Sequence, residues 1–128
     1  MNVKWKYVEK LDENQLTKIE NYFNIKLPND YKEALTKCNR GKPQQCNFNT
    51  ENRKDCVLDY MINLEETIQI SKRVKNNKLI SIATDPFGNL IGYQIDNNEI
   101  SSIIFWDHET KKSTFIADNF KAFLNKLY

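Results

Sequence analysis

Hydrophobic and polar positions alternate most clearly over residues 79–109, where short runs rich in Ile, Phe, Tyr and Trp are separated by two polar segments. This pattern predicts consecutive antiparallel strands at residues 79–83, 90–95 and 103–107, with residues 114–116 as a candidate fourth strand. Because no other part of the chain is as apolar for as long, we expect this meander to form the core that the helices cover.

The segment between the first two predicted strands, D-P-F-G-N at residues 85–89, has the composition of a tight turn. Pro86 fixes φ near the value that a turn start needs, and Gly88 takes a positive φ at no steric cost. The segment has too few glycines for a phosphate-binding loop. We therefore interpret it as a structural turn.

Apolar residues at helical spacing lie on both sides of the meander. They predict a first helix capped by Asp12, a second capped by Asn29, a third over residues 64–75 capped by Asn63, and a last helix starting at residues 118–119. The order of helices, then strands, then a helix favours an α+β fold, which we expect to form one domain over residues 1–128.

The segments between these elements show weaker patterns. Gly41 is expected to end the second helix in the left-handed conformation. Residues 5–8 predict a short strand or helical turn, and residues 57–58 a short strand. Residues 44–55 are polar, and we interpret most of them as an exposed loop in which Phe48 anchors a short edge strand.

Composition excludes several classes of protein. The 128 residues carry a net charge of +2, with basic and acidic residues mixed along the chain, which does not favour nucleic-acid binding. The one basic cluster, residues 72–78, is interpreted as a solvated helix end, with a phosphate-binding patch as the alternative. There is no apolar run near the roughly 20 residues that span a bilayer and no signal-peptide pattern, so we expect a cytoplasmic protein without membrane contact.

The three cysteines, Cys38, Cys46 and Cys56, contain no C-x-x-C pair, and the chain has a single histidine. A structural zinc site is therefore not expected. We interpret the cysteines as reduced thiols; an intramolecular disulfide or a redox role is the alternative.

Candidate catalytic groups are few. His108 lies between Asp107 and Glu109 at a predicted strand end, and alternation along a strand would turn the histidine away from both carboxylates. We accordingly expect no catalytic residue, metal site or cofactor, and a protein that is not an enzyme. The neighbouring Trp106 is expected in the core.

Five short motifs follow one another along the chain: L-P-N-D-Y-K at residues 27–32, N-R-G-K-P at 39–43, I-A-T-D-P-F-G-N at 82–89, I-F-W-D-H-E at 104–109, and I-A-D-N-F followed by F-L at 116–124. Together they resemble the SUKH superfamily, the domain shared by yeast cell-wall assembly regulators and many bacterial immunity proteins. Arg40 stands where that family often has a glycine, and Asn119 where a capping serine is usual.

The resemblance implies a curved antiparallel sheet with helices packed around it. It further implies that bacterial members bind a cognate polymorphic toxin, often a nuclease, and block it without chemistry. We therefore expect an immunity protein (antitoxin) whose partner is a toxin domain. The alternative is a non-catalytic regulatory adaptor in cell-wall assembly or signalling.

A nuclease toxin tends to be basic, so its inhibitor would present acidic groups. The slightly basic net charge weakens this version, but a local acidic patch can still serve. Four acids near strand ends or turns are the predicted partner-binding residues: Asp96, Glu99, Asp107 and Glu109. Reversing Asp107 and Glu109 to Lys is expected to weaken toxin binding and to leave the thermal midpoint nearly unchanged.

Overall fold

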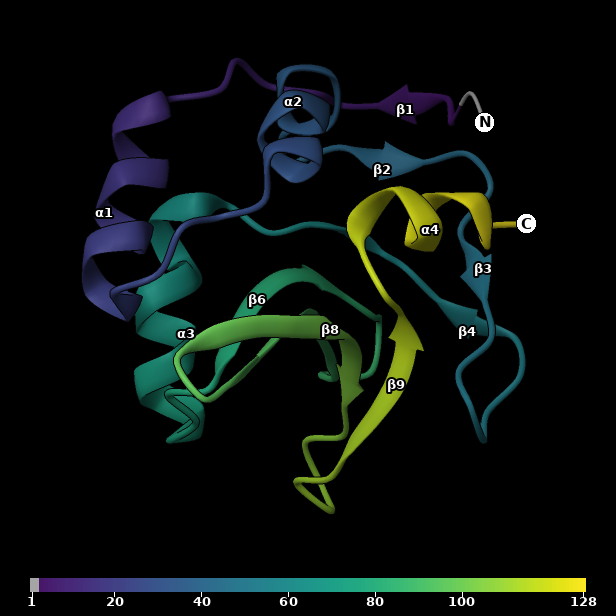
Figure 1. Ribbon diagram of the computed structural model, residues 1–128. Helices are drawn as coiled ribbons and strands as arrows, with labels where there is room; N and C mark the ends of the chain where they lie inside the picture. The colour runs from purple at the N-terminus through teal and green to yellow at the C-terminus, as the bar shows by residue number, and fades with distance from the viewer. Residues whose placement is uncertain (1–2) are drawn as a thin grey trace.

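The predicted meander forms the main sheet, at the centre of a computed structural model that describes residues 3–128 (Figure 1). The sheet has the strand order β5 (Tyr60–Met61), β6 (Leu79–Thr84), β7 (Leu90–Asp96), β8 (Glu99–Trp106) and β9 (Ser113–Ala117). Each neighbouring pair is antiparallel, and register shifts interrupt the β6–β7, β7–β8 and β8–β9 pairings. Such bulges bend strands, and β6 and β8 arch visibly in Figure 1.

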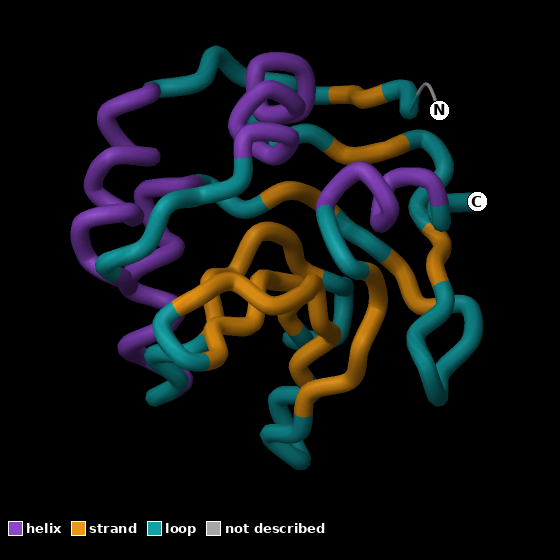
Figure 2. Tube along the Cα trace, in the orientation of Figure 1, coloured by secondary structure: helices purple, strands orange, loops and turns teal. Residues whose placement is uncertain are grey.

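Four helices and two small ribbons lie beside and above this sheet in the view of Figure 2, within residues 3–128. The helices are α1 (Glu13–Phe23), α2 (Asn29–Cys38), α3 (Thr67–Val74), which follows the 3₁₀ turn η1 (Leu64–Glu66), and α4 (Phe120–Asn125). One ribbon pairs β1 (Trp5–Lys6) with β2 (Lys42–Pro43), and the other pairs β3 (Asn47–Phe48) with β4 (Cys56–Val57). The α+β prediction is thereby confirmed.

The two faces of the sheet bury separate clusters, because successive residues of a strand point to opposite sides. In β8, Ile103 and Phe105 join the larger cluster, which includes side chains from α1, α2 and α4. Ile104 and Trp106 join the smaller cluster, which α3 closes with Ile70. The predicted burial of Trp106 is confirmed, since only 3% of the residue is exposed.

Two predictions for the main sheet need correction. β8 begins at Glu99 and ends at Trp106, so Asp107 lies outside it. The Asp107 carboxylate accepts hydrogen bonds from the backbone N–H groups of Glu109 and Thr110. These local bonds start a turn instead of extending the strand. The second correction is β5, which the sequence did not indicate as part of the sheet.

The helix caps are mostly as predicted. Asp12, Asn63 and Asn119 each accept a hydrogen bond from a backbone N–H in the first turn of the helix they precede. The prediction for Asn29 is wrong, because the residue is already helical and Pro28 occupies the N-cap position. Proline fixes φ at a value that suits this entry into the helix, where its missing N–H costs nothing.

The end of α2 also differs from the prediction. Arg40, not Gly41, has the positive φ, at 60°. Gly41 is instead needed for close packing, since a Cβ there would lie 3.0 Å from the carbonyl oxygen of Cys38. This turn is therefore formed with an arginine in the left-handed region.

The interpretation of residues 44–55 is confirmed, since most of these residues are exposed and irregular and Phe48 lies in a short strand. Phe48 is fully buried and belongs to β3, and its partner strand β4 lies one residue earlier than predicted. The backbone of Asn47 also exchanges two hydrogen bonds of 2.9 Å with Tyr128. The predicted strand near the N-terminus is β1.

All three cysteines are free thiols, as predicted. Burial raises the pKa of the Cys38 thiol to about 12, which keeps it protonated and unreactive. In the β3–β4 ribbon, Phe48 pairs with Cys56, and Cys46 accepts a hydrogen bond from Leu58. Cys46 and Cys56 are thus diagonal neighbours across the two strands. Their Cα atoms are about 7–8 Å apart, which exceeds the usual Cα–Cα distance of a disulfide.

No helix within residues 3–128 combines the length and the apolar character that a membrane crossing needs.

Candidate functional site

The structure divides the four predicted partner-binding acids between the two ends of β8. Asp96 and Glu99 pair across the β7–β8 hairpin, whereas Asp107 and Glu109 follow the other end of the strand. The eight residues of β8 span about 25 Å at the usual rise per residue. The four acids therefore do not form one patch, and their role in partner binding stays a prediction.

Asp107 and Glu109 border a hollow of about 700 Å³, here called the strand-end hollow. Three segments line it: the turn between β6 and β7, the turn between β8 and β9, and the loop between β3 and β4. Glu99 borders a different hollow, between α1 and the β7–β8 hairpin.

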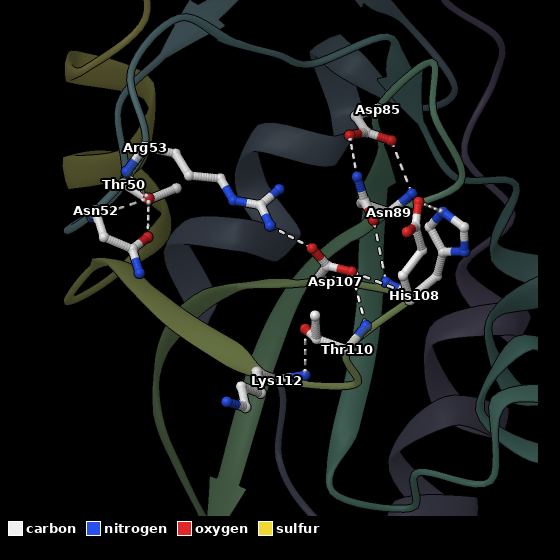
Figure 3. A network of polar contacts seen from close by, with 10 residues as sticks. Thr50, Asn52, Arg53, Asp85, Asn89, Asp107, His108, Thr110 and Lys112 are labelled. Carbon is white, nitrogen blue, oxygen red and sulfur yellow. Dashed lines mark hydrogen bonds and ion pairs between the residues drawn. The ribbon is translucent and has the colours of Figure 1, made fainter.

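The β6–β7 turn is held by the carboxylate of Asp85. One oxygen accepts the N–H groups of Phe87 (2.9 Å) and Asn89 (2.7 Å), and the other accepts the Asn89 side-chain amide (2.8 Å). Gly88 has a φ of 91°, which confirms the predicted turn chemistry. The Asn89 side-chain oxygen accepts the His108 N–H at 3.0 Å, so this turn is bonded directly to the next one (Figure 3).

The β8–β9 turn is held by the carboxylate of Asp107. Its Oδ1 accepts the N–H groups of Glu109 (2.8 Å) and Thr110 (3.1 Å), and its Oδ2 pairs with Arg53 from the β3–β4 loop (Figure 3). The Arg53 guanidinium also lies 4.9 Å from the centre of the Phe105 ring. Hydrogen bonds from the Thr110 backbone, the Arg53 side chain and the Glu109 backbone lower the pKa of Asp107 from 3.8 to about 2.

This lowered pKa predicts a specific acid response. The charged carboxylate stabilises the fold above pH 4, and its contribution is lost as pH falls from about 4 to 2 and the group is protonated. Asp107→Asn should therefore melt below wild type at neutral pH, and the difference in thermal midpoint should shrink between pH 4 and 2. Glu109→Gln, at an exposed position, is the matched control. A constant difference across this range would contradict a role for the Asp107 charge.

His108 and Glu109 are not joined by a hydrogen bond. The His108 Nε2 lies 3.8 Å from the Glu109 carboxylate, which is longer than a hydrogen bond. The expected strand alternation is wrong here, because residues 107–110 form a turn; the ring lies instead against Gly88, where a Cβ would be 3.4 Å from it. Within residues 3–128, no group of three or more His, Cys, Asp or Glu side chains is arranged to hold a metal ion.

Phe87 is the feature of this site that sequence reasoning missed. It lines the strand-end hollow and is 72% exposed, although large aromatic side chains are usually buried. The sequence did contain a signal for this exposure. Phe87 lies in the middle of the D-P-F-G turn, and a side chain at that position points away from the sheet. Asp85 holds its backbone, so the ring is presented from a rigid turn.

Comparison with known proteins identifies the family. The SUKH_6 family model, described as SMI1-KNR4 cell-wall, matches residues 13–124, which include α1 and the complete main sheet. A search of curated proteins gives no match. The matched residues also contain the five motifs that carry the resemblance. The chain therefore belongs to the SUKH superfamily, in its SMI1-KNR4 family.

Proposed function

We propose that this protein is a cytoplasmic bacterial immunity protein that binds a cognate polymorphic toxin domain and neutralises it by direct contact. In this proposal, residues 1–128 form one SUKH-like domain without cofactor, metal or catalytic activity. Family membership supports a function in protein–protein interaction. The observation that carries the proposal is the strand-end hollow with the exposed Phe87 at its edge.

The strand-end hollow has the properties of a preorganised protein-binding site. Its lining turns are held by Asp85 and Asp107 and joined by Asn89, so little ordering entropy is lost on binding. Aromatic residues, phenylalanine included, are enriched in protein–protein interfaces, whose rim is polar. Phe87 is accordingly the proposed anchor residue.

The two acids of the hollow have different roles in this proposal. Asp107 is engaged by Arg53 and by two backbone N–H groups, and its charge is used inside the protein. The Glu109 side chain is 81% exposed and is the acid available to a partner. Reversing Asp107 is therefore expected to lower the thermal midpoint. Glu109→Lys is the cleaner test of whether an acidic side chain of the hollow contributes to toxin binding.

A toxin-binding experiment tests the proposal. The C-terminal domain encoded by the neighbouring gene is expressed with the tagged protein, and growth rescue and binding affinity are measured. Tight binding with rescue is expected, and Phe87→Ala should raise Kd about 30-fold or more, since truncation of a hot-spot residue costs 2 kcal/mol or more. Its thermal midpoint should stay near wild type because the ring is exposed.

The matched control is Tyr60→Ala, which removes another exposed aromatic, from β5 at the edge of the main sheet. Its affinity should change less than threefold. Equal losses for both variants would move the interface away from the strand-end hollow, and absence of both binding and rescue would contradict the immunity function.

The second candidate function is a non-catalytic regulatory adaptor in cell-wall assembly or signalling. The cell-wall description of the matching family model favours it. An adaptor would bind a host protein and give no protection against the neighbouring gene product. Rescue of growth therefore separates the two functions.

A further inference from the structure

A second hollow adjoins the strand-end hollow, with His108 in the lining of both. We call it the basic pocket. It is an open surface hollow of about 350 Å³, lined by the exposed residues Arg73 and Lys75 at the end of α3, by Lys111 in the β8–β9 turn, and by Gly88 in the β6–β7 turn. Segments distant in sequence thus bring basic side chains around one small space.

The charges in the basic pocket are not balanced by the protein. No carboxylate is among the side chains that line it. Within residues 3–128, four ion pairs involve cations outside the pocket and the fifth joins His108 of its lining to Glu109, whereas Arg73, Lys75 and Lys111 have no carboxylate oxygen within 4 Å. The nearest acid identified at this edge is Glu109, through its 3.8 Å approach to His108. Three cations that face a shared space repel one another unless an anion enters it.

The surroundings of the basic pocket suit an anion. Leu90 and Trp106 provide an apolar lining, and such walls focus the field of nearby charges. The carbonyl end of α3 would repel an anion, but the Ser71 and Lys72 carbonyls accept hydrogen bonds from the backbone of Lys75 and Asn76. The opposing dipole is thereby reduced where the cations converge.

We propose that the basic pocket binds a phosphate group, either as inorganic phosphate or as the terminal phosphate of a nucleotide. A dianionic phosphate matches the excess of positive charge better than a single carboxylate does. An arginine fork offers paired donors to its oxygens, and two lysines supply point charges. In this proposal the basic cluster at residues 72–78 supplies Arg73 and Lys75 to the phosphate site. Lys111, from the β8–β9 turn, completes the site. This inference does not depend on the proposed function.

A titration of the full isotope-labelled chain with sodium phosphate tests the proposal. Amide chemical shifts are followed by NMR at constant ionic strength, with sodium chloride as the reference salt. Saturable shifts are expected at residues 73–76, 88 and 108–111. Separate arms use ADP and adenosine: tighter binding of ADP than of phosphate, with adenosine inactive, identifies a nucleotide phosphate, and equal binding identifies inorganic phosphate as sufficient.

Matched charge variants distinguish the pocket from general surface charge. The triple variant Arg73→Gln, Lys75→Gln, Lys111→Gln should weaken phosphate binding at least tenfold. The control Lys78→Gln, Lys112→Gln, Lys121→Gln removes the same charge from exposed positions outside the pocket and should change the affinity less than twofold. Glu109→Gln should strengthen binding about twofold, because it removes a nearby negative charge. Unsaturable shifts, or equal losses in the two triple variants with unchanged melting, would overturn the proposal.

Discussion

Gly92→Ala is expected to destabilise the protein by about 3 kcal/mol or more, at the upper end for overpacking. A Cβ at Gly92 in β7 would lie 2.3 Å from the Ile80 carbonyl oxygen of β6 and 2.8 Å from a methyl group of Leu79. Because the closest atom belongs to the backbone, a rotamer change cannot relieve the clash, and β6 must move. β6 is held there by its pairing with β7 and by the register shift after Ser81.

Urea unfolding of Gly92→Ala against wild type measures this effect. Ser113→Ala, at an exposed position of strand β9, is the control and should change stability by less than about 0.5 kcal/mol. A Gly92→Ala variant with the wild-type midpoint would show that β6 and β7 do not approach as closely as described. Since a domain is stable by only about 5–15 kcal/mol, the expected loss is large enough to reduce the yield of folded protein.

Trp106→Ala should destabilise the protein by about 3–5 kcal/mol, the range for large aromatic truncations in a core. The side chain is almost fully buried in the smaller cluster with Ile62, Ile70 and Leu90. This cluster has few members, so the cavity left by the indole cannot be filled by neighbouring side chains without moving α3.

Thermal and chemical unfolding of Trp106→Ala and Trp106→Phe measure this loss. The phenylalanine variant keeps most of the apolar area and should lose less stability than the alanine variant. Tyr60→Ala, with an exposed ring, should unfold close to wild type. Wild-type unfolding of Trp106→Ala would contradict the burial of α3 against this face of the sheet.

Within the main sheet, the strands that sequence reasoning predicted are those with enough length to show a period. β6, β7 and β8 each carry several alternating or apolar positions, and α1 shows one buried stripe. β5 is two residues long and belongs to the sheet only through its pairs with Ala83 and Thr84. Two residues cannot show a period of two, so β5 leaves no periodic signal in the sequence.

Only those parts of the candidate site that depend on residues close together in the sequence were predictable. The turn at residues 85–89 depends on Asp85, Pro86 and Gly88, which are close together in the sequence, and it was predicted correctly. The ion pair of Arg53 with Asp107 joins residues 54 positions apart. The convergence of Lys75 and Lys111 depends equally on the fold, and neither pairing leaves a signal in a single sequence.

The strand order of the main sheet, β5-β6-β7-β8-β9, has a consequence for folding kinetics. Every pairing in this sheet joins strands that are neighbours in the chain, and the β6–β7 and β7–β8 connections are short. Closing short loops costs little entropy, and proteins rich in local pairings cross lower topological barriers. The sheet can therefore nucleate at one hairpin and extend strand by strand, while α1 and α2, from the other half of the chain, dock on a surface that has already formed.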